Sequence, residues 1–167
     1  GMSIDYNKYF SRYIDLVKQE EINLALANNH SNGMGLVKSI SEDQATYRYG
    51  EDKWSIKELF SHIVDTERIF SYRALRFARN DKTELAGYDE NHFAIFSGAD
   101  ERPFRDIVNE FDYTRLSTIA MFTSFSPEAL LRSGRANGVE IDVKSLAYLI
   151  AGHCQHHLNI LRERYLN

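Results

Sequence analysis

Two histidines near the end of the chain have the spacing of a metal-binding pair. His153 and His157 stand four residues apart in the segment GHCQHH at 152–157. In an α-helix this spacing places both imidazoles on one face, one turn apart. Such a pair can hold one metal ion from a single helix, as in the H-E-x-x-H zinc proteases. No glutamate follows His153, so that protease motif itself is absent.

A third candidate ligand, His62, lies on the apolar stripe of a different predicted helix. Helical bundles build metal sites from side chains on facing helices, and three protein ligands with an open position are typical of catalytic zinc. A core histidine without metal is the alternative for each residue, although two unpaired imidazoles side by side are costly to bury. His156 could replace His157, but the apolar line of the helix favours His157.

Carboxylates and arginines near the predicted inner faces are candidates for supporting roles. A histidine that binds a metal needs an acceptor for its second ring N–H. Glu20, Glu21 and Asp65 are candidate acceptors, with solvated carboxylates as the alternative. Arg73 and Arg115 could hold an anionic substrate, or they could pair with interior carboxylates or extend to solvent.

The remaining histidines and the single cysteine have simpler interpretations. Cys154 is about 100° round the helix from His153, so we expect it to pack against a neighbouring helix as a small apolar residue, outside the coordination site. His30 and His92 lie in predicted loops, where exposure to solvent is the expected state. No residue is identified as catalytic by its type and spacing alone.

The elements that carry these residues are predicted to be helices. Apolar residues recur at steps of three and four between the turn signals, which favours an all-α domain. We expect four long helices, near 5–27, 56–79, 103–124 and 142–165. Four amphipathic helices with two rather long connections are typical of a four-helix bundle.

Local signals mark where these helices begin and end. Ser55 and Glu58 have the spacing of a capping box, and Asp142 is a plausible N-cap of the last helix. Asn, Ser and Gly residues at 28–35 predict the end of the first helix. The stretch 82–99 is predicted to be a long connection, of a length that is often functional. Two further turns are expected at 126–128 and 134–138.

Length and composition favour one globular domain over 1–167, with Gly1 before Met2 interpreted as a scar of tag removal. A hydrophobic content of 43% argues against disorder. The net charge of −4 and the lack of a basic cluster disfavour nucleic-acid binding. No apolar run approaches the ~18 residues of a membrane span. The absence of a signal-peptide pattern and the single Cys154 favour the cytoplasm.

Two segments resemble signature motifs of the DinB superfamily. Residues 53–62, KWSIKELFSH, are similar to the K-W-S-x-x-E-x-x-x-H pattern that opens the second helix of these proteins. Residues 152–157 resemble the G-H-x-x-H-H signature of the last helix, and the arginine-bearing stretch 111–116 fits the third helix. The resemblance extends over about 5–165, nearly the whole chain.

The resemblance implies a four-helix bundle with up-down-down-up topology that binds a divalent metal, nickel or zinc, through three histidines. Carried over to this sequence, the ligands are His62, His153 and His157. The superfamily includes YfiT-like metal-dependent hydrolases, and some relatives are thiol transferases or isomerases that use bacillithiol, mycothiol or glutathione. No thiol-cofactor motif is found here, so the substrate does not carry over.

Motifs and resemblance together predict a metal-dependent hydrolase or a thiol S-transferase. A divalent ion in an open site lowers the pKa of a bound water or thiol and so supplies a nucleophile. The expected partner is a small molecule, such as a low-molecular-weight thiol, and a homodimer is expected from the frequency of such assemblies. The alternative is a non-catalytic, stress-related protein that binds metal for sensing or interaction, for which a fourth protein ligand would close the site.

Overall fold

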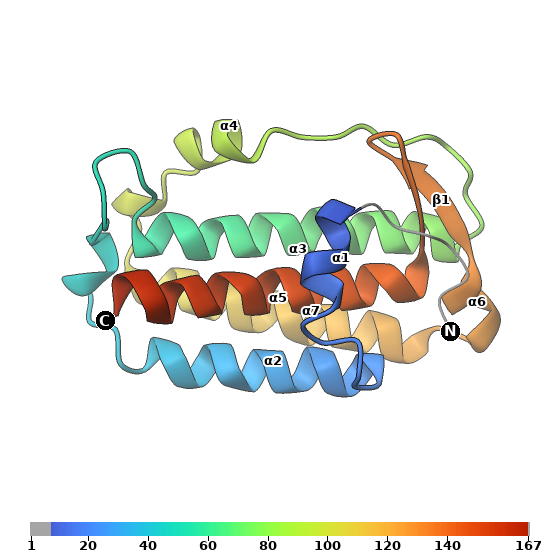
Figure 1. The fold of residues 1–167 in the computed structure, drawn as a ribbon, viewed down its shortest axis with the longest axis horizontal. Coiled ribbons are helices and arrows are strands. Elements are labelled where there is room, and N and C mark those ends of the chain that lie inside the picture. The colour runs from blue at the N-terminus through green and yellow to red at the C-terminus, as the bar shows by residue number, and fades with distance from the viewer. Residues whose placement is uncertain (1–7, 167) are drawn as a thin grey trace.

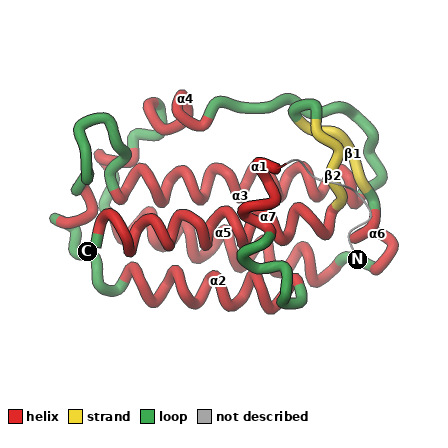
Figure 2. The backbone as a smooth tube through the Cα atoms, viewed as in Figure 1, coloured by secondary structure: helices red, strands yellow, loops and turns green. Residues whose placement is uncertain are grey.

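The computed structural model describes residues 8–166, which form a bundle of helices (Figure 1). Four long helices lie side by side along the longest axis of the molecule, as Figure 2 also shows: α2 (Ile22–Val37), α3 (Ile56–Ala78), α5 (Phe104–Ser124) and α7 (Val143–Ile160). The predicted all-α four-helix bundle is therefore confirmed. Its only sheet, within the described residues, is a two-stranded hairpin.

The order of the helices follows the up-down-down-up topology. In Figure 1, α2 and α7 run in one direction, whereas α3 and α5 run in the other. The long helices α3 and α5 follow each other in the bundle and run parallel. The chain must therefore return along the whole bundle between them. This crossover carries the short helix α4 (Glu90–Ile95) and a 3₁₀ turn at Ala99–Glu101.

Three of the four predicted long helices have the expected bounds. The capping box of α3 is present, because the Ser55 side chain accepts the Glu58 N–H at 3.0 Å and the Glu58 side chain accepts the Ser55 N–H at 3.0 Å. The Asp142 carboxylate accepts the Ser145 N–H at 2.6 Å and begins α7. After Ile160, α7 continues into a π-helical turn at Leu161–Tyr165.

The prediction of one first helix over 5–27 is wrong. The described part of this stretch forms α1 (Lys8–Ile14), a turn-rich link, and then α2, which continues through 28–35. The Glu21 side chain accepts backbone N–H groups of the first turn and begins α2. Residues 5–7 lie outside the described residues.

Tertiary contacts explain why α2 continues through an asparagine-rich stretch. Asn29 is buried, and its side chain accepts a hydrogen bond from Arg115 at 2.7 Å and donates one to Gln155 at 3.1 Å. These partners lie on α5 and α7, so the sequence around Asn29 does not contain the contacts that stabilise the helix there.

Helix α1 packs directly on α7 at Gly152. A Cβ atom on this glycine would lie 2.0 Å from the carbonyl oxygen of Tyr13, so no larger residue fits without moving α1. The close approach brings the aromatic side chains of α1 to the middle of α7.

The chain between α5 and α7 forms more than the expected turns. Residues 126–132 contain α6 (Pro127–Leu131), and 133–142 form a hairpin of β1 (Ser133–Ala136) and β2 (Val139–Asp142) rather than a single turn at 134–138. The two residues at its tip, Asn137 and Gly138, have φ angles of 52° and 75°. The Asn137 N–H donates to the carbonyl oxygen of Leu85 at 2.9 Å, which attaches the crossover to the hairpin.

The core consists of two apolar clusters along the bundle. One includes Phe70 and Ile150, and the other includes Ile63 and Leu158. Each cluster therefore contains residues of both α3 and α7. A 3₁₀ turn at Gln44–Thr46 packs on α3 in the α2–α3 connection. Among helices within 8–166, none has the length and apolar character needed to cross a membrane.

Candidate metal centre

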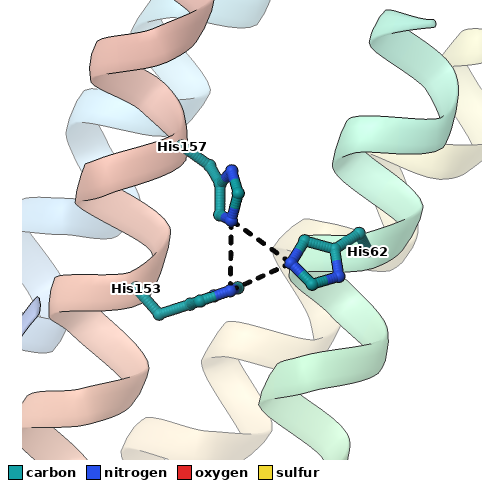
Figure 3. A group of neighbouring side chains, drawn as sticks. All are labelled: His62, His153 and His157. Atoms are coloured by element: carbon teal, nitrogen blue, oxygen red, sulfur yellow. Dashed lines mark hydrogen bonds between the residues drawn. The ribbon is translucent and has the colours of Figure 1, made fainter. Parts of the chain in front are cut away.

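His62, His153 and His157 converge between α3 and α7 (Figure 3). The Nε2 atom of His62 lies 3.0 Å from that of His153 and 3.2 Å from that of His157, and the last two atoms are 3.2 Å apart. His62 is 4% exposed and His153 is 6% exposed, so these imidazoles are held in the interior. The structure thus brings together the three residues that the sequence selects.

This triangle of nitrogens cannot be satisfied by hydrogen bonds alone. Each neutral imidazole nitrogen is either a donor or an acceptor. Among three atoms in mutual contact, at least two must therefore have the same role. A shared cation resolves the conflict, because all three lone pairs can then point inward. Tetrahedral zinc with Zn–N bonds of about 2.0–2.1 Å separates its ligand nitrogens by about 3.3–3.4 Å, close to the observed spacing.

Burial keeps the three imidazoles in the neutral form that binds metals. It lowers the pKa of His62 to about 4 and that of His157 to about 2. The pKa of His153 is well below its usual value, first because of burial and then because of the neighbouring His157. Each ring is therefore uncharged at neutral pH and has one nitrogen whose lone pair can bind a metal.

The second ring nitrogen of His62 faces a hydroxyl group rather than a carboxylate. The His62 Nδ1 atom lies 3.5 Å from the Thr66 Oγ1 atom, which in turn is 2.7 Å from the Tyr88 hydroxyl. The Trp54 ring packs against His62 with 4.6 Å between ring centroids. The His157 Nδ1 atom is buried and has no hydrogen-bond partner in 8–166.

The carboxylates expected to support the histidines have other partners. Glu20 accepts a hydrogen bond from Asn28 at 2.7 Å, and Glu21 caps α2. Both residues precede α2 rather than belonging to an inner helical face, since the predicted first helix is interrupted there. Asp65 is partly buried, and its charged neighbours are Glu110, Arg68 and Arg102.

Glu90 is the acidic residue beside the cluster, and it is not among the residues predicted from the sequence. Its Oε2 atom lies 3.8 Å from the His62 Nε2 atom, and its side chain is 43% exposed. Burial raises the pKa of Glu90. The residue is in the first turn of α4, which Asp89 caps by accepting the N–H groups of Asn91 and His92. This N-cap pattern in the long connection was the available sequence signal.

A cavity of about 210 Å³ adjoins the centre on one side. Its wall includes His153, Thr66, Glu90 and Arg73, together with aromatic side chains of α1, α3 and the crossover. Arg73 is 6% exposed, and its Nη2 atom donates to the carbonyl oxygen of Ala86 at 3.1 Å. A second cavity of about 250 Å³ is lined by His157, with Trp54, Lys53 and Arg164 among its other residues.

Arg115 is fully buried and paired within the chain, which leaves it no free donor for the substrate role that the sequence also offered. Its side chain is completely buried, and it donates to the Glu67 carboxylate at 2.8–3.2 Å, to Asn29 at 2.7 Å and to the Leu26 carbonyl oxygen at 3.0 Å. The alternative interpretation, pairing with an interior carboxylate, is the one that the structure supports.

The other histidines and the cysteine lie outside the cluster. His156 packs on the Tyr13 ring at 5.1 Å between centroids. His30 is in α2 rather than in a loop, and its Nε2 atom is 2.7 Å from an Asp112 carboxylate oxygen, whereas His92 is exposed in α4. Cys154 lies in the apolar cluster with Leu158, and burial raises the pKa of its thiol to about 11.

Fold and site together define a four-helix bundle with a histidine cluster in its interior. The chain belongs to the DinB superfamily, whose family model matches residues 25–161. No curated protein matches the sequence.

The bundle is also similar to a solved structure, that of YfiT from Bacillus subtilis, which is described as a probable metal-dependent hydrolase with an unusual four-helix bundle topology. The two share 13% sequence identity with a TM-score of 0.70, over 95% of this chain and 87% of that one. The likeness concerns the fold. Superfamily membership and the three-histidine cluster together fit a metal-binding protein.

Proposed function

We propose that His62, His153 and His157 hold a divalent metal ion, nickel or zinc, and that the protein is a metal-dependent hydrolase of a small molecule. The observation that carries this proposal is the triangle of three neutral Nε2 atoms at 3.0–3.2 Å, which hydrogen bonding alone cannot satisfy. A bound divalent ion supplies Lewis-acid chemistry, because it lowers the pKa of a water or thiol that it binds.

Side chains around the cluster have distinct parts in such a hydrolysis. The Glu90 carboxylate faces the cavity beside His62 and accepts the proton of the attacking water as a general base. A general base works best when its pKa is near the working pH. Burial raises the pKa of Glu90 and so moves it in that direction. The Thr66 hydroxyl holds the orientation of the His62 ring.

Thiol S-transfer is the second candidate function, and the paired cavities favour it. His153 faces the cavity of about 210 Å³ and His157 faces the one of about 250 Å³. Two reactants could therefore reach the same centre through two different cavities. In this case a thiol takes the place of water, and Glu90 accepts the thiol proton.

The Glu90→Gln variant tests the hydrolytic proposal and separates it from a closed, non-catalytic site. With zinc or nickel bound, we expect the rate constant for p-nitrophenyl acetate hydrolysis to fall about 100-fold, because the general base is lost. Metal content should stay unchanged. Loss of the metal from this variant would show that Glu90 is a fourth ligand and would contradict the open site. Glu84→Gln, an exposed change in the same crossover, is the matched control.

We further propose a cytoplasmic location and a homodimer. A single cysteine, which is buried in the core, suits a reducing compartment. The dimer is tested by light scattering of the purified protein, for which a mass near twice 19.4 kDa is expected.

A further inference from the structure

Arg73 is a buried cation in the wall of the cavity next to His153. It is 6% exposed, and the hydrogen-bond acceptor that its guanidinium reaches is the carbonyl oxygen of Ala86. The Phe70 ring lies below it, with 5.6 Å from the guanidinium carbon to the ring centroid. Within residues 8–166, no carboxylate oxygen lies within 4.0 Å of its nitrogens.

The buried charge of Arg115, in contrast, is neutralised by partners within the chain. Its guanidinium pairs with the Glu67 carboxylate, and the side chain of Asn29 and the carbonyl of Leu26 accept further hydrogen bonds. Burying a charge without a partner is costly. The contrast indicates that residues 8–166 leave the charge of Arg73 available for an anion in the cavity.

The acidic residue that shares the cavity does not neutralise Arg73. Glu90 lies 3.8 Å from His62, and the charges that shift its pKa are those of Asp89 and Arg12. The group that acts electrostatically on Arg73 is the Tyr88 hydroxyl, while burial lowers the pKa of the guanidinium. An anion that enters the cavity would therefore find the Arg73 guanidinium without a carboxylate already bound to it.

The position of Arg73 on α3 sets the shape of a ligand that would use it. Arg73 follows His62 by eleven residues, which is about 16 Å along a helix axis. Thr66 and Phe70 lie between them at helical spacing and line the same cavity. Helical side chains lean toward the N-terminus, so the long arginine side chain turns back toward the histidines.

We propose that Arg73 binds the anionic end of an elongated substrate, a carboxylate or phosphate group, whose other end reacts at the histidine centre. This inference rests on the proposed metal-dependent function and specifies its substrate class. The planar guanidinium suits two-point recognition of such oxyacids, and the aromatic walls of the cavity suit an apolar linker.

Binding of ω-mercapto compounds to the zinc-loaded protein tests this inference, since a thiol binds zinc and leaves the far end free. We expect 6-mercaptohexanoate to bind at least tenfold more tightly than 6-mercaptohexanol by titration calorimetry. In Arg73→Gln this advantage should disappear. In Arg68→Gln, where an exposed arginine of the same helix is changed, it should remain. A phosphonate of equal length shows which oxyacid is preferred.

The outcomes separate this inference from the proposed function. If zinc-loaded wild-type protein binds the acid and phosphonate no more tightly than the alcohol, the anion site is refuted while the metal centre stands. If the protein binds neither zinc nor nickel, the proposed function fails, and this inference, which rests on it, fails too. The wild-type comparison remains decisive even if the Arg73→Gln variant does not fold.

Discussion

The Thr66 hydroxyl lies between His62 and Tyr88 and connects the histidine cluster to the crossover. Its Oγ1 atom is 3.5 Å from the His62 Nδ1 atom and 2.7 Å from the Tyr88 hydroxyl. Groups that hold the second nitrogen of a metal-binding histidine orient the ring. This small residue therefore supports the position of the His62 ring in the proposed metal site.

The Thr66→Val variant should bind zinc about 10- to 100-fold more weakly than wild type, because His62 loses its oxygen partner while the shape of the side chain is kept. Zinc affinity is measured by competition with a chromogenic chelator. Thr118→Val, a buried change on α5, should leave the affinity unaltered. Equal affinities in Thr66→Val and wild type would contradict this role of the hydroxyl.

The sequence predicts the three clustered histidines better than the residues that surround them. The i,i+4 spacing of His153 and His157 fixes their shared face, and His62 is on the inner stripe of a helix with a clear capping box. Thr66 follows His62 by four residues and Glu90 follows the Asp89 N-cap, but neither pattern alone shows that the residue lies beside the histidines. Both residues lie beside the histidines because the crossover brings Tyr88 and α4 against α3, which only the folded chain shows.

The buried Arg115–Glu67 pair ties three elements together. Arg115 projects from α5, Glu67 from α3, and the Asn29 and Leu26 acceptors belong to α2. The pair explains why an arginine occupies the inner face of α5 and why α2 is held along that face. Its effect is structural and separate from the metal centre.

Replacing Arg115 by Met should lower the free energy of unfolding by about 3–5 kcal/mol, because the Glu67 carboxylate is left buried without its cation. Urea denaturation followed by circular dichroism measures the change. The double variant Arg115→Met, Glu67→Met should recover most of the loss, since both charges are then removed. A single variant as stable as wild type would show that the pair contributes no stability.

Helix bounds were predictable where local caps determine them. Ser55 and Asp142 begin α3 and α7 through side-chain hydrogen bonds to the first turn. The first helix was mispredicted because α2 is stabilised by long-range contacts of Asn29. The Asn137-Gly138 dipeptide is typical of a hairpin tip. The sequence prediction includes only the turn at 134–138, whereas the structure has paired strands on both sides of it.

Over the whole molecule, the parallel order of α3 and α5 creates the site's outer wall. The crossover between these helices has to travel the length of the bundle (Figure 1). It carries Tyr88 and Glu90 to the cavity that His153 also lines. Topology thus supplies the residues that the four long helices lack. The histidines themselves remain in the interior, where they are neutral.

The metal-free protein should lose stability as the pH falls below about 6.5, the ordinary pKa of histidine in an unfolded chain. The pKa of folded His62 is lowered to about 4 and that of His157 to about 2, so the unfolded state binds protons more readily over this range. Thermal unfolding at pH 7, 6 and 5 measures the decline. His157→Gln should show a shallower decline, and an identical slope would contradict the burial effect.

The central claim is that His62, His153 and His157 form one metal site, and the metal content of purified variants tests it most directly. Mass spectrometry of the metal bound by untagged protein should find near-stoichiometric nickel or zinc in wild type. His62→Ala, His153→Ala and His157→Ala should each lose the ion while remaining folded. His156→Ala should retain it, because that ring packs on Tyr13 outside the cluster. Full metal retention in His62→Ala together with loss in His156→Ala would contradict the site.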